Sequence, residues 1–228
     1  MQHSLTKTAL TPSTITTVEN SLSAFRSFAT KLDIPTTAFE NQGFIKQLEL
    51  TAPKQQLAIV EQIQVLGELF AFAASSSDVE KDQDLEIYCV QRALWKYGLF
   101  SKMDLSEIIE KDEVIEVYST SQLQIYRNLY FFKLCSYSLF DIMSREWFEL
   151  YDRPEFITRQ LMGEVEETFR KDTLHTCSLP AHLMTEKLSS SEGRSFLTNF
   201  KKMLPLYNEA GGPSAFLVTI DAKMNLGN

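Results

Sequence analysis

The side chains most able to bind a transition metal lie close together near the end of the chain. His175, Cys177 and His182 fall within one short segment. On an extended strand, His175 and Cys177 would face the same side, as two ligands of a zinc site must. His182 is an odd number of residues from both and would face the other side, and no fourth ligand has a suitable spacing. The sequence therefore predicts structural roles for these residues and no metal site.

Other reactive side chains also favour structural roles. Cys135 lies in the apolar segment KLCSY, where a thiol acts as a small core hydrophobe, and no histidine follows closely enough to activate it. Glu164, Glu166 and Glu167 belong to an amphipathic helical pattern and are expected on a solvated face. The sequence contains no glycine-rich phosphate loop, no HExxH and no GxSxG. We expect no enzymatic activity; the rival enzyme hypothesis would use His175 and nearby carboxylates on an unrecognised fold.

Composition and charge limit the partners. Of 228 residues, 44% are hydrophobic, which is enough for a folded core. The formal charge of −8 predicts no binding to nucleic acid or to an anionic membrane. The longest apolar stretch, Val65–Ala74, is too short to cross a bilayer, and the start, MQHSLTKTAL, lacks a signal-peptide core. Three cysteines without a CxxC pair favour a reducing compartment, so we expect a cytoplasmic protein.

The first half of the chain has helical periodicity. Residues 1–12 are polar and expected to be disordered, and residues 13–111 are expected to form a helical region. Its helices are predicted at about 13–32, 37–50, 53–74 and 79–97, with a short one after Asp104 and no strand. The linker Ser75–Asp78 separates two of them.

One stripe of the first helix repeats with alternating steps of three and four residues, as in a coiled coil. Two interpretations stay open: the stripe packs inside a helical bundle of the same chain, or it pairs two copies in a symmetric dimer. The stripe consists of Ile15, Val18, Leu22, Phe25, Ala29 and Leu32.

Strand-like patterns begin after Lys111. Val114–Tyr118 and Leu123–Tyr126 predict a hairpin, and the turn residues Asn208–Gly212 predict antiparallel pairing of the two segments beside them. Between these regions, residues 129–169 have helical spacing. Three later strands are expected over 174–183, 196–207 and 215–220. The order β-β-α-α-α-β-β-β predicts an α+β fold, an antiparallel sheet with helices across one face.

This order and the residues that carry it resemble a PAS domain. The segment VIEVYSTSQLQIYRNLYFFKLCSYSLFDIMSREWFELYDRP, residues 114–154, follows the family pattern with few gaps. Asn128 occupies the asparagine position after the second strand, Phe131 follows three residues later, and Leu134, Tyr137 and Ser138 match the next conserved run. Ser136 departs from the usual glycine. Asn128 is also expected to bond a neighbouring backbone group and hold the corner. The resemblance covers about residues 112–222 and implies a PAS-like domain over 112–228 with a five-stranded sheet.

The resemblance argues against the cofactors that some PAS domains carry. Haem-binding members usually present a histidine from the helix before the third strand, and residues 154–170 contain none. Flavin photosensors of the family carry a cysteine motif in the same region, where this chain reads RPEFITRQLM. We therefore expect no cofactor.

The resemblance implies a non-enzymatic sensory or regulatory module in signal transduction. A small ligand or a partner signalling protein would act on the PAS-like domain, and the N-terminal helices would relay the change, with the chain as a homodimer. The dense aromatic residues give either a filled core or a small cavity. The alternative function is a protein–protein interaction adaptor with a filled core and no ligand. Expected ligand contacts are Phe131, Cys135, Trp147, Phe148, Phe156, His175 and Phe216.

Overall fold

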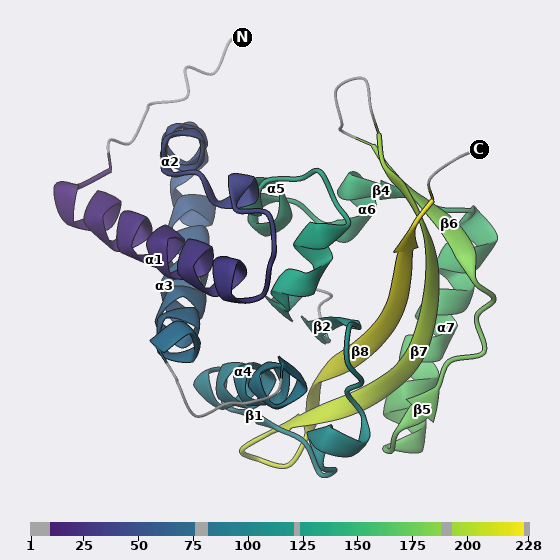
Figure 1. The fold of residues 1–228 in the computed structure, drawn as a ribbon. Helices are drawn as coiled ribbons and strands as arrows, with labels where there is room; N and C mark the ends of the chain where they lie inside the picture. Colours follow the sequence, from purple (N-terminus) through teal and green to yellow (C-terminus); the bar gives the residue numbers. More distant parts are fainter. Residues whose placement is uncertain (1–9, 76–81, 121–123, 188–192, 226–228) are drawn as a thin grey trace, which may run out of the picture. The chain divides into compact units, whose positions relative to one another are not determined.

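The computed structural model describes residues 10–75, 82–120, 124–187 and 193–225 (Figure 1). Most of the segment expected to be disordered, most of the Ser75–Asp78 linker, the start of the helix expected at 79–97 and Leu123 lie outside the described residues.

The chain divides into two compact units. The first comprises Met1–Ser76 and Tyr137–Arg145, and the second comprises Ser77–Ser136 and Glu146–Asn228. The division thus falls about 35 residues before the boundary expected at 111/112. A short segment from the middle of the chain also joins the N-terminal unit, which local periodicity cannot reveal because membership depends on long-range packing.

The N-terminal unit is helical, as the periodicity predicts. Thr11 caps the first helix by accepting a 3.2 Å hydrogen bond from the Thr14 backbone, and proline opens both long helices, where its missing N–H costs nothing. The unit consists of α1 (Pro12–Lys31), η1 (Thr37–Phe39), α2 (Asn41–Glu49), α3 (Pro53–Ser75) and the inserted α5 (Leu139–Ser144).

The stripe on α1 packs inside this unit. Phe70 of α3 lies between Phe25 and Phe28, with ring centroids 4.8 Å and 5.0 Å apart, and Phe39 closes on Phe25 at 5.6 Å. The expected dimer surface is therefore corrected, because most of its residues are already covered by the same chain. Four of the six stripe residues are buried: Val18, Leu22, Phe25 and Ala29. Homodimerisation itself stays a prediction, without this stripe as its surface.

Helix α3 covers the span predicted at 53–74 and runs for 23 residues. Its longest apolar stretch, Val65–Ala74, is short and contains Glu68, but the helix as a whole is long and apolar enough to cross a membrane. The same test is passed by core helices of globular proteins. In the N-terminal unit, the apolar face of α3 contributes Ile59, Ile63, Phe70 and Ala73 to the buried core.

The close approach of α1 and α3 depends on Gly67. A Cβ atom at Gly67 would lie 2.5 Å from the Cβ of Ser21 and 2.7 Å from its Cα. Gly67→Ala is therefore expected to lower the free energy of unfolding of this unit by about 1–3 kcal/mol, because the helix backbones must separate. Urea unfolding followed by far-UV circular dichroism measures the change.

Gly43 supplies the matched control, because an added Cβ would meet nothing within 4 Å on helix α2. Gly43→Ala should leave stability unchanged or raise it by up to about 1 kcal/mol. Equal effects of the two substitutions would contradict the close packing of α1 on α3.

The C-terminal unit is α+β. Its long strand pair, β7 and β8, curves beside helix α7 (Figure 1). The expected absence of strands before residue 111 is wrong, since two residues form β1. The elements are α4 (Asp82–Lys96), β1 (Leu99–Phe100), η2 (Leu105–Glu107), β2 (Val114–Ser119), β3 (Gln124–Arg127), η3 (Leu129–Lys133), α6 (Trp147–Leu150), β4 (Tyr151–Asp152), α7 (Glu155–Lys171), β5 (His175–Thr176), β6 (His182–Glu186), β7 (Ser195–Asn208) and β8 (Pro213–Met224).

The sheet brings the first hairpin beside the last strand. Its order is β3-β2-β8-β7-β6-β4, and every pair is antiparallel; β1 and β5 add short pairings to β7. The expected pairing of the last two strands is confirmed. The strand expected over 174–183 is instead two pieces, β5 and β6, because the chain leaves the sheet around Leu179-Pro180.

Two polar residues fix the corners of this sheet. Asn208 Oδ1 accepts hydrogen bonds from the Ala210 and Gly212 backbones, and Gly211 takes the left-handed conformation that the turn requires, with φ of 79°. The expected corner role of Asn128 is confirmed. Its Oδ1 accepts from the Ile115 backbone at 3.1 Å, and its Nδ2 donates to the Glu113 carbonyl at 2.8 Å.

Candidate ligand-binding cavity

A cavity of about 60 Å³ lies against the inner face of the sheet. It could hold about four water molecules or one small organic group. Side chains along a strand point alternately to the two faces of the sheet, and those on the inner face line the cavity. A bulge at Lys201 shifts this alternation by one residue, so that Met203 also points inward. The strand residues that line it are Val114, Glu116, Tyr118, Arg127, Tyr151, Met184, Phe196, Thr198, Phe200, Met203, Phe216, Val218, Ile220 and Ala222. Phe131, Leu134, Trp147, Arg153 and three residues of α7 (Leu161, Met162 and Val165) complete the wall.

One side of the cavity carries a buried ion pair. Arg127 of β3 bonds Glu116 of β2 across the hairpin, and both side chains are more than 90% buried. Tyr118 donates its hydroxyl to the second Glu116 oxygen at 2.9 Å. Burial, reinforced by Glu116, raises the pKa of Tyr118 far above its ordinary value, so the phenol stays protonated as a donor. Both oxygens of Glu116 are therefore engaged.

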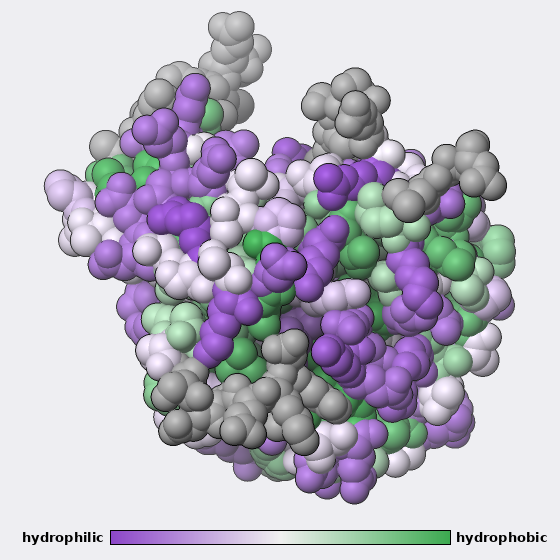
Figure 2. All heavy atoms as spheres, viewed as in Figure 1, coloured by the Kyte–Doolittle hydropathy of each residue, from purple (hydrophilic) through white to green (hydrophobic). Residues whose placement is uncertain are grey.

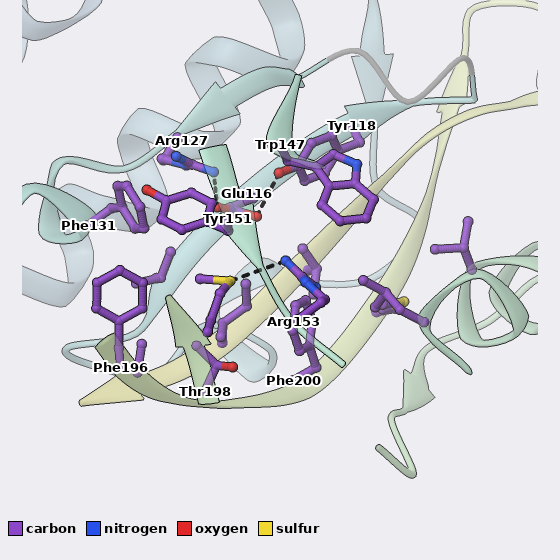
Figure 3. Close-up of a pocket in the computed structure, with 18 of the residues that line it drawn as sticks. Glu116, Tyr118, Arg127, Phe131, Trp147, Tyr151, Arg153, Phe196, Thr198 and Phe200 are labelled. Atoms are coloured by element: carbon purple, nitrogen blue, oxygen red, sulfur yellow. Dashed lines mark hydrogen bonds and ion pairs between the residues drawn. The ribbon is translucent and has the colours of Figure 1, made fainter. Parts of the chain in front are cut away.

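Arg153, just before α7, points into the cavity from a different direction (Figure 3). Its Nη2 donates to the Met184 sulfur at 3.2 Å, and its guanidinium lies 4.6 Å from the Trp147 ring centroid. The Nε and Nη1 atoms are buried and have no hydrogen-bond partner in the part of the chain that the structure describes. Burial lowers the pKa of Arg153, and the nearby Tyr118 and Glu116 offset this effect only in part.

Three of the seven expected ligand contacts line this cavity: Phe131, Trp147 and Phe216. Cys135 is buried but is not part of the lining. Phe148 and Phe156 do not line the cavity either: they lie in the first turns of α6 and α7 and are 48% and 54% exposed. Neighbouring positions on a helix face different directions, and the sequence pattern did not resolve which aromatic residue turned inward.

His175 does not line the cavity either. Its Nε2 bonds Glu164 of α7, and the other Glu164 oxygen accepts from the Ser178 backbone at 2.9 Å. Glu164 is buried, so the expectation that it lies on a solvated face is corrected. These contacts attach the β5 region to α7 on a side that does not line the cavity.

The remaining histidine and cysteine candidates have local partners as well. His182 faces Thr198 at 3.2 Å and stacks on Phe200. Burial, then Glu164, raises the pKa of Cys177 to about 12, which makes it a poor thiolate ligand at neutral pH. Within the described ranges, no group of three histidine, cysteine or acidic side chains is placed to hold a metal ion.

Glu164 gives a pH-dependent prediction. Burial alone would raise its pKa, but hydrogen bonds from Ser178 and His175 bring it below the ordinary value of 4.5. A carboxyl with a lower pKa in the folded state stabilises the fold above the unfolded pKa and loses this effect as the pH falls through the folded value. Glu164→Gln should therefore flatten the loss of stability below about pH 4.5.

Urea unfolding of Glu164→Gln at a series of pH values, followed by tryptophan fluorescence, measures this effect. Glu166→Gln, at an exposed site on the same helix, is the control and should keep the wild-type slope. Identical slopes for wild type and Glu164→Gln would rule out the stabilising role of the Glu164 contacts.

The polar residues of the cavity were missed by the sequence reasoning. Glu116 lies on the same strand face as Val114 and Tyr118. A charged residue on this inward face was a usable signal of a polar group in the cavity. Arg127 ends the paired strand and is its natural partner. Arg153 gave no local signal, because its direction depends on how the chain turns between β4 and α7.

The outer surface of the unit differs from the cavity. Figure 2 shows hydrophilic residues over the region where Figure 1 draws β7 and β8. Among the charged residues of this unit, Lys201 and Lys202 both pair with Glu110, at 2.6 Å and 3.0 Å. Hydrophobic residues reach the surface around β6, and Leu183 and Leu197, which are direct partners in register, are each about half exposed.

Comparisons with known proteins give structural neighbours only. No protein-family model matches the chain, and no curated protein is significantly similar to it. The light-state dimer of the fungal blue-light photoreceptor Vivid matches with a TM-score of 0.32 and 8% identity, over 50% of this chain and 79% of that one. An RNA-binding light-oxygen-voltage receptor matches with a TM-score of 0.34 and 11% identity, over 91% of this chain and 56% of that one.

The fold of the C-terminal unit follows from its own strand order and from the segment between Val114 and Pro154. A hairpin pairs with the last of three further antiparallel strands, and α7 packs on β7 and β8. The C-terminal unit therefore has a PAS-like fold.

Proposed function

We propose that this chain is a non-enzymatic sensory or regulatory module that binds a small molecule in the cavity and relays binding to its N-terminal helices. One observation carries the proposal. Leu134 and Trp147 both line the cavity, and the segment between them, Tyr137–Arg145, is part of the N-terminal unit. The chain therefore leaves one wall of the cavity, enters the helical unit and returns to the cavity wall.

The inserted segment is anchored at several points within the N-terminal unit. A capping box between Ser138 and Asp141 fixes the start of α5. The ring of Phe140 meets Phe44 of α2 edge-on at 5.4 Å, and Gln55 of α3 donates to the Ser144 carbonyl at 2.7 Å. A ligand that repositions Leu134 or Trp147 would move the ends of a segment packed on α2 and α3, which supports a two-state relay.

The test of binding uses a cavity-filling variant. Ala222→Leu adds three carbon atoms to a side chain that lines the cavity. In a thermal-shift screen of a small-molecule library, we expect compounds that stabilise the wild type and have no effect on Ala222→Leu. Compounds that stabilise both proteins equally, with none selective for the wild type, would favour the adaptor with a filled core.

The test of relay uses hydrogen–deuterium exchange with a compound from that screen. Binding should change exchange in α2 and α3 of the wild type, and Phe140→Ala should bind the compound but lose this remote change. Phe72→Ala is the control, because Phe72 of α3 is 53% exposed. Exchange changes confined to the C-terminal unit in the wild type would contradict the relay.

A further inference from the structure

We propose that the ligand of the cavity is a small organic carboxylate whose charge is neutralised by Arg153. The inference rests on the proposed ligand-binding function and adds the chemical class of the ligand. The geometry behind it is the arrangement of three charged side chains around one cavity, Glu116, Arg127 and Arg153 (Figure 3).

Of the three charged side chains, Arg127 and Glu116 form an ion pair, and Arg153 has no ion-pair partner among the described residues. Glu116 gives one oxygen to Arg127 and the other to Tyr118. No carboxylate lies within ion-pair distance of Arg153 among the residues that the structure describes. Glu116 acts on Arg153 only through space, and the effect of burial on the Arg153 pKa is larger. Two charges of one sign and one of the other thus border the cavity, with a net charge of +1.

Arg153 is half-buried, and the two guanidinium nitrogens that are fully buried make its uncompensated charge costly. A charged group removed from water without a partner loses several kcal/mol of solvation, so native structures seldom keep one without a role. The Nε and Nη1 groups of Arg153 donate to nothing in the described chain. A guanidinium matches a carboxylate in plane and spacing, so one such group satisfies both the charge and the donors.

The rest of the cavity selects among anions. Beyond Arg153, the wall presents apolar side chains such as Met162, Val218 and Ile220, which favour an alkyl body. A phosphate dianion would need a second free cation, and Arg127 is already paired. A volume of about 60 Å³ suits roughly two to four carbon atoms with one carboxylate.

Trp147 provides the readout, because its indole stacks on Arg153 and a bound carboxylate changes its surroundings. The chain has two tryptophans, and the other, Trp95, is 66% exposed, so a Trp95→Phe background isolates the signal. The probes are sodium butyrate, neutral butyramide and inorganic phosphate at constant ionic strength. We expect butyrate to change Trp147 fluorescence saturably and to bind at least tenfold more tightly than butyramide or phosphate.

Variants at Arg153 assign the preference. Arg153→Met should abolish the preference for butyrate over butyramide, and Arg153→Lys should keep the preference with weaker binding. Arg159→Met, which removes an exposed cation from α7, is the matched control and should bind butyrate as the wild type does. Arg153→Met should also melt no lower than the wild type, because it removes an unpaired charge; a purely structural arginine would predict a lower melting temperature.

The outcomes separate the two proposals. Equal binding of butyrate and butyramide, unchanged by Arg153→Met, would overturn the carboxylate assignment and leave the cavity as a ligand site. Phosphate binding more tightly than butyrate would also overturn it. No saturable response to any probe, together with no cavity-selective compound in the thermal-shift screen, would overturn both the assignment and the proposed function.

Discussion

Replacement of Arg127 by methionine is expected to lower the free energy of unfolding of the C-terminal unit by about 3–5 kcal/mol. The substitution leaves the Glu116 carboxylate buried, with its hydroxyl donor Tyr118 but without its cation. Removing one partner of a buried pair costs far more than the pair contributes as a whole, because the remaining charge keeps its desolvation penalty. Urea unfolding followed by tryptophan fluorescence measures this unit, since both tryptophans belong to it.

The double variant Glu116→Leu/Arg127→Met is the matched control. With both charges removed, we expect most of the lost stability to return. A double variant as unstable as Arg127→Met would show that the loss comes from packing against Phe131, whose ring centroid lies 4.1 Å from the Arg127 guanidinium. Arg153→Met makes the same chemical change at an arginine that has no ion-pair partner among the described residues. Unlike Arg127→Met, it should not lower the free energy of unfolding.

Phe131→Ala is expected to have a similarly large effect, lowering the free energy of unfolding by about 3–5 kcal/mol. The ring is almost fully buried and meets Tyr151 and Phe196 edge-on at 6.0 Å and 6.5 Å. Because Phe131 also lines the cavity, the variant should enlarge it and shift binding towards longer carboxylates.

The matched control for this substitution is Phe148→Ala, which removes a phenylalanine that is 48% exposed in the same unit. Its expected change is within about 0.5 kcal/mol. Tryptophan-detected unfolding measures both variants. A loss for Phe131→Ala no greater than that for Phe148→Ala would contradict its place in the core.

Much of the fold could be predicted because it depends on local periodicity and turn chemistry. The helices that begin at Pro12 and Pro53, the pairing across Asn208–Gly212 and the corner at Asn128 each follow from signals within a few residues. The two interpretations of the first helix needed the structure. A stripe on one helix shows that a face is buried, and only the tertiary contacts show that α3 of the same chain covers it.

The cavity could be predicted only in part. The many aromatic residues of this region led to the correct prediction that Phe131, Trp147 and Phe216 line the cavity, because large rings near a sheet usually face its core. The same signal also selected Phe148 and Phe156, which lie on the exposed sides of α6 and α7. Arg153 escaped prediction because a charged residue beside a proline looks like a surface turn, and its burial arises from packing against Trp147 and Met184.

The insertion of Tyr137–Arg145 into the helical unit was equally hidden. The family pattern runs continuously through this segment, so sequence alone assigns it to the PAS-like domain. Its contacts with α2 and α3 place it with the N-terminal unit. The segment is therefore joined at both ends to residues of the cavity wall, Leu134 and Trp147, while it packs in the helical unit.

Occupancy of the cavity by a small molecule can be measured by native mass spectrometry. Spectra of freshly purified wild type and Ala222→Leu are recorded side by side after exposure to millimolar butyrate. We expect a one-to-one adduct on the wild type that Ala222→Leu lacks. Adducts of equal abundance on both proteins, or bare masses for both at every butyrate concentration that saturates Trp147 fluorescence, would contradict it.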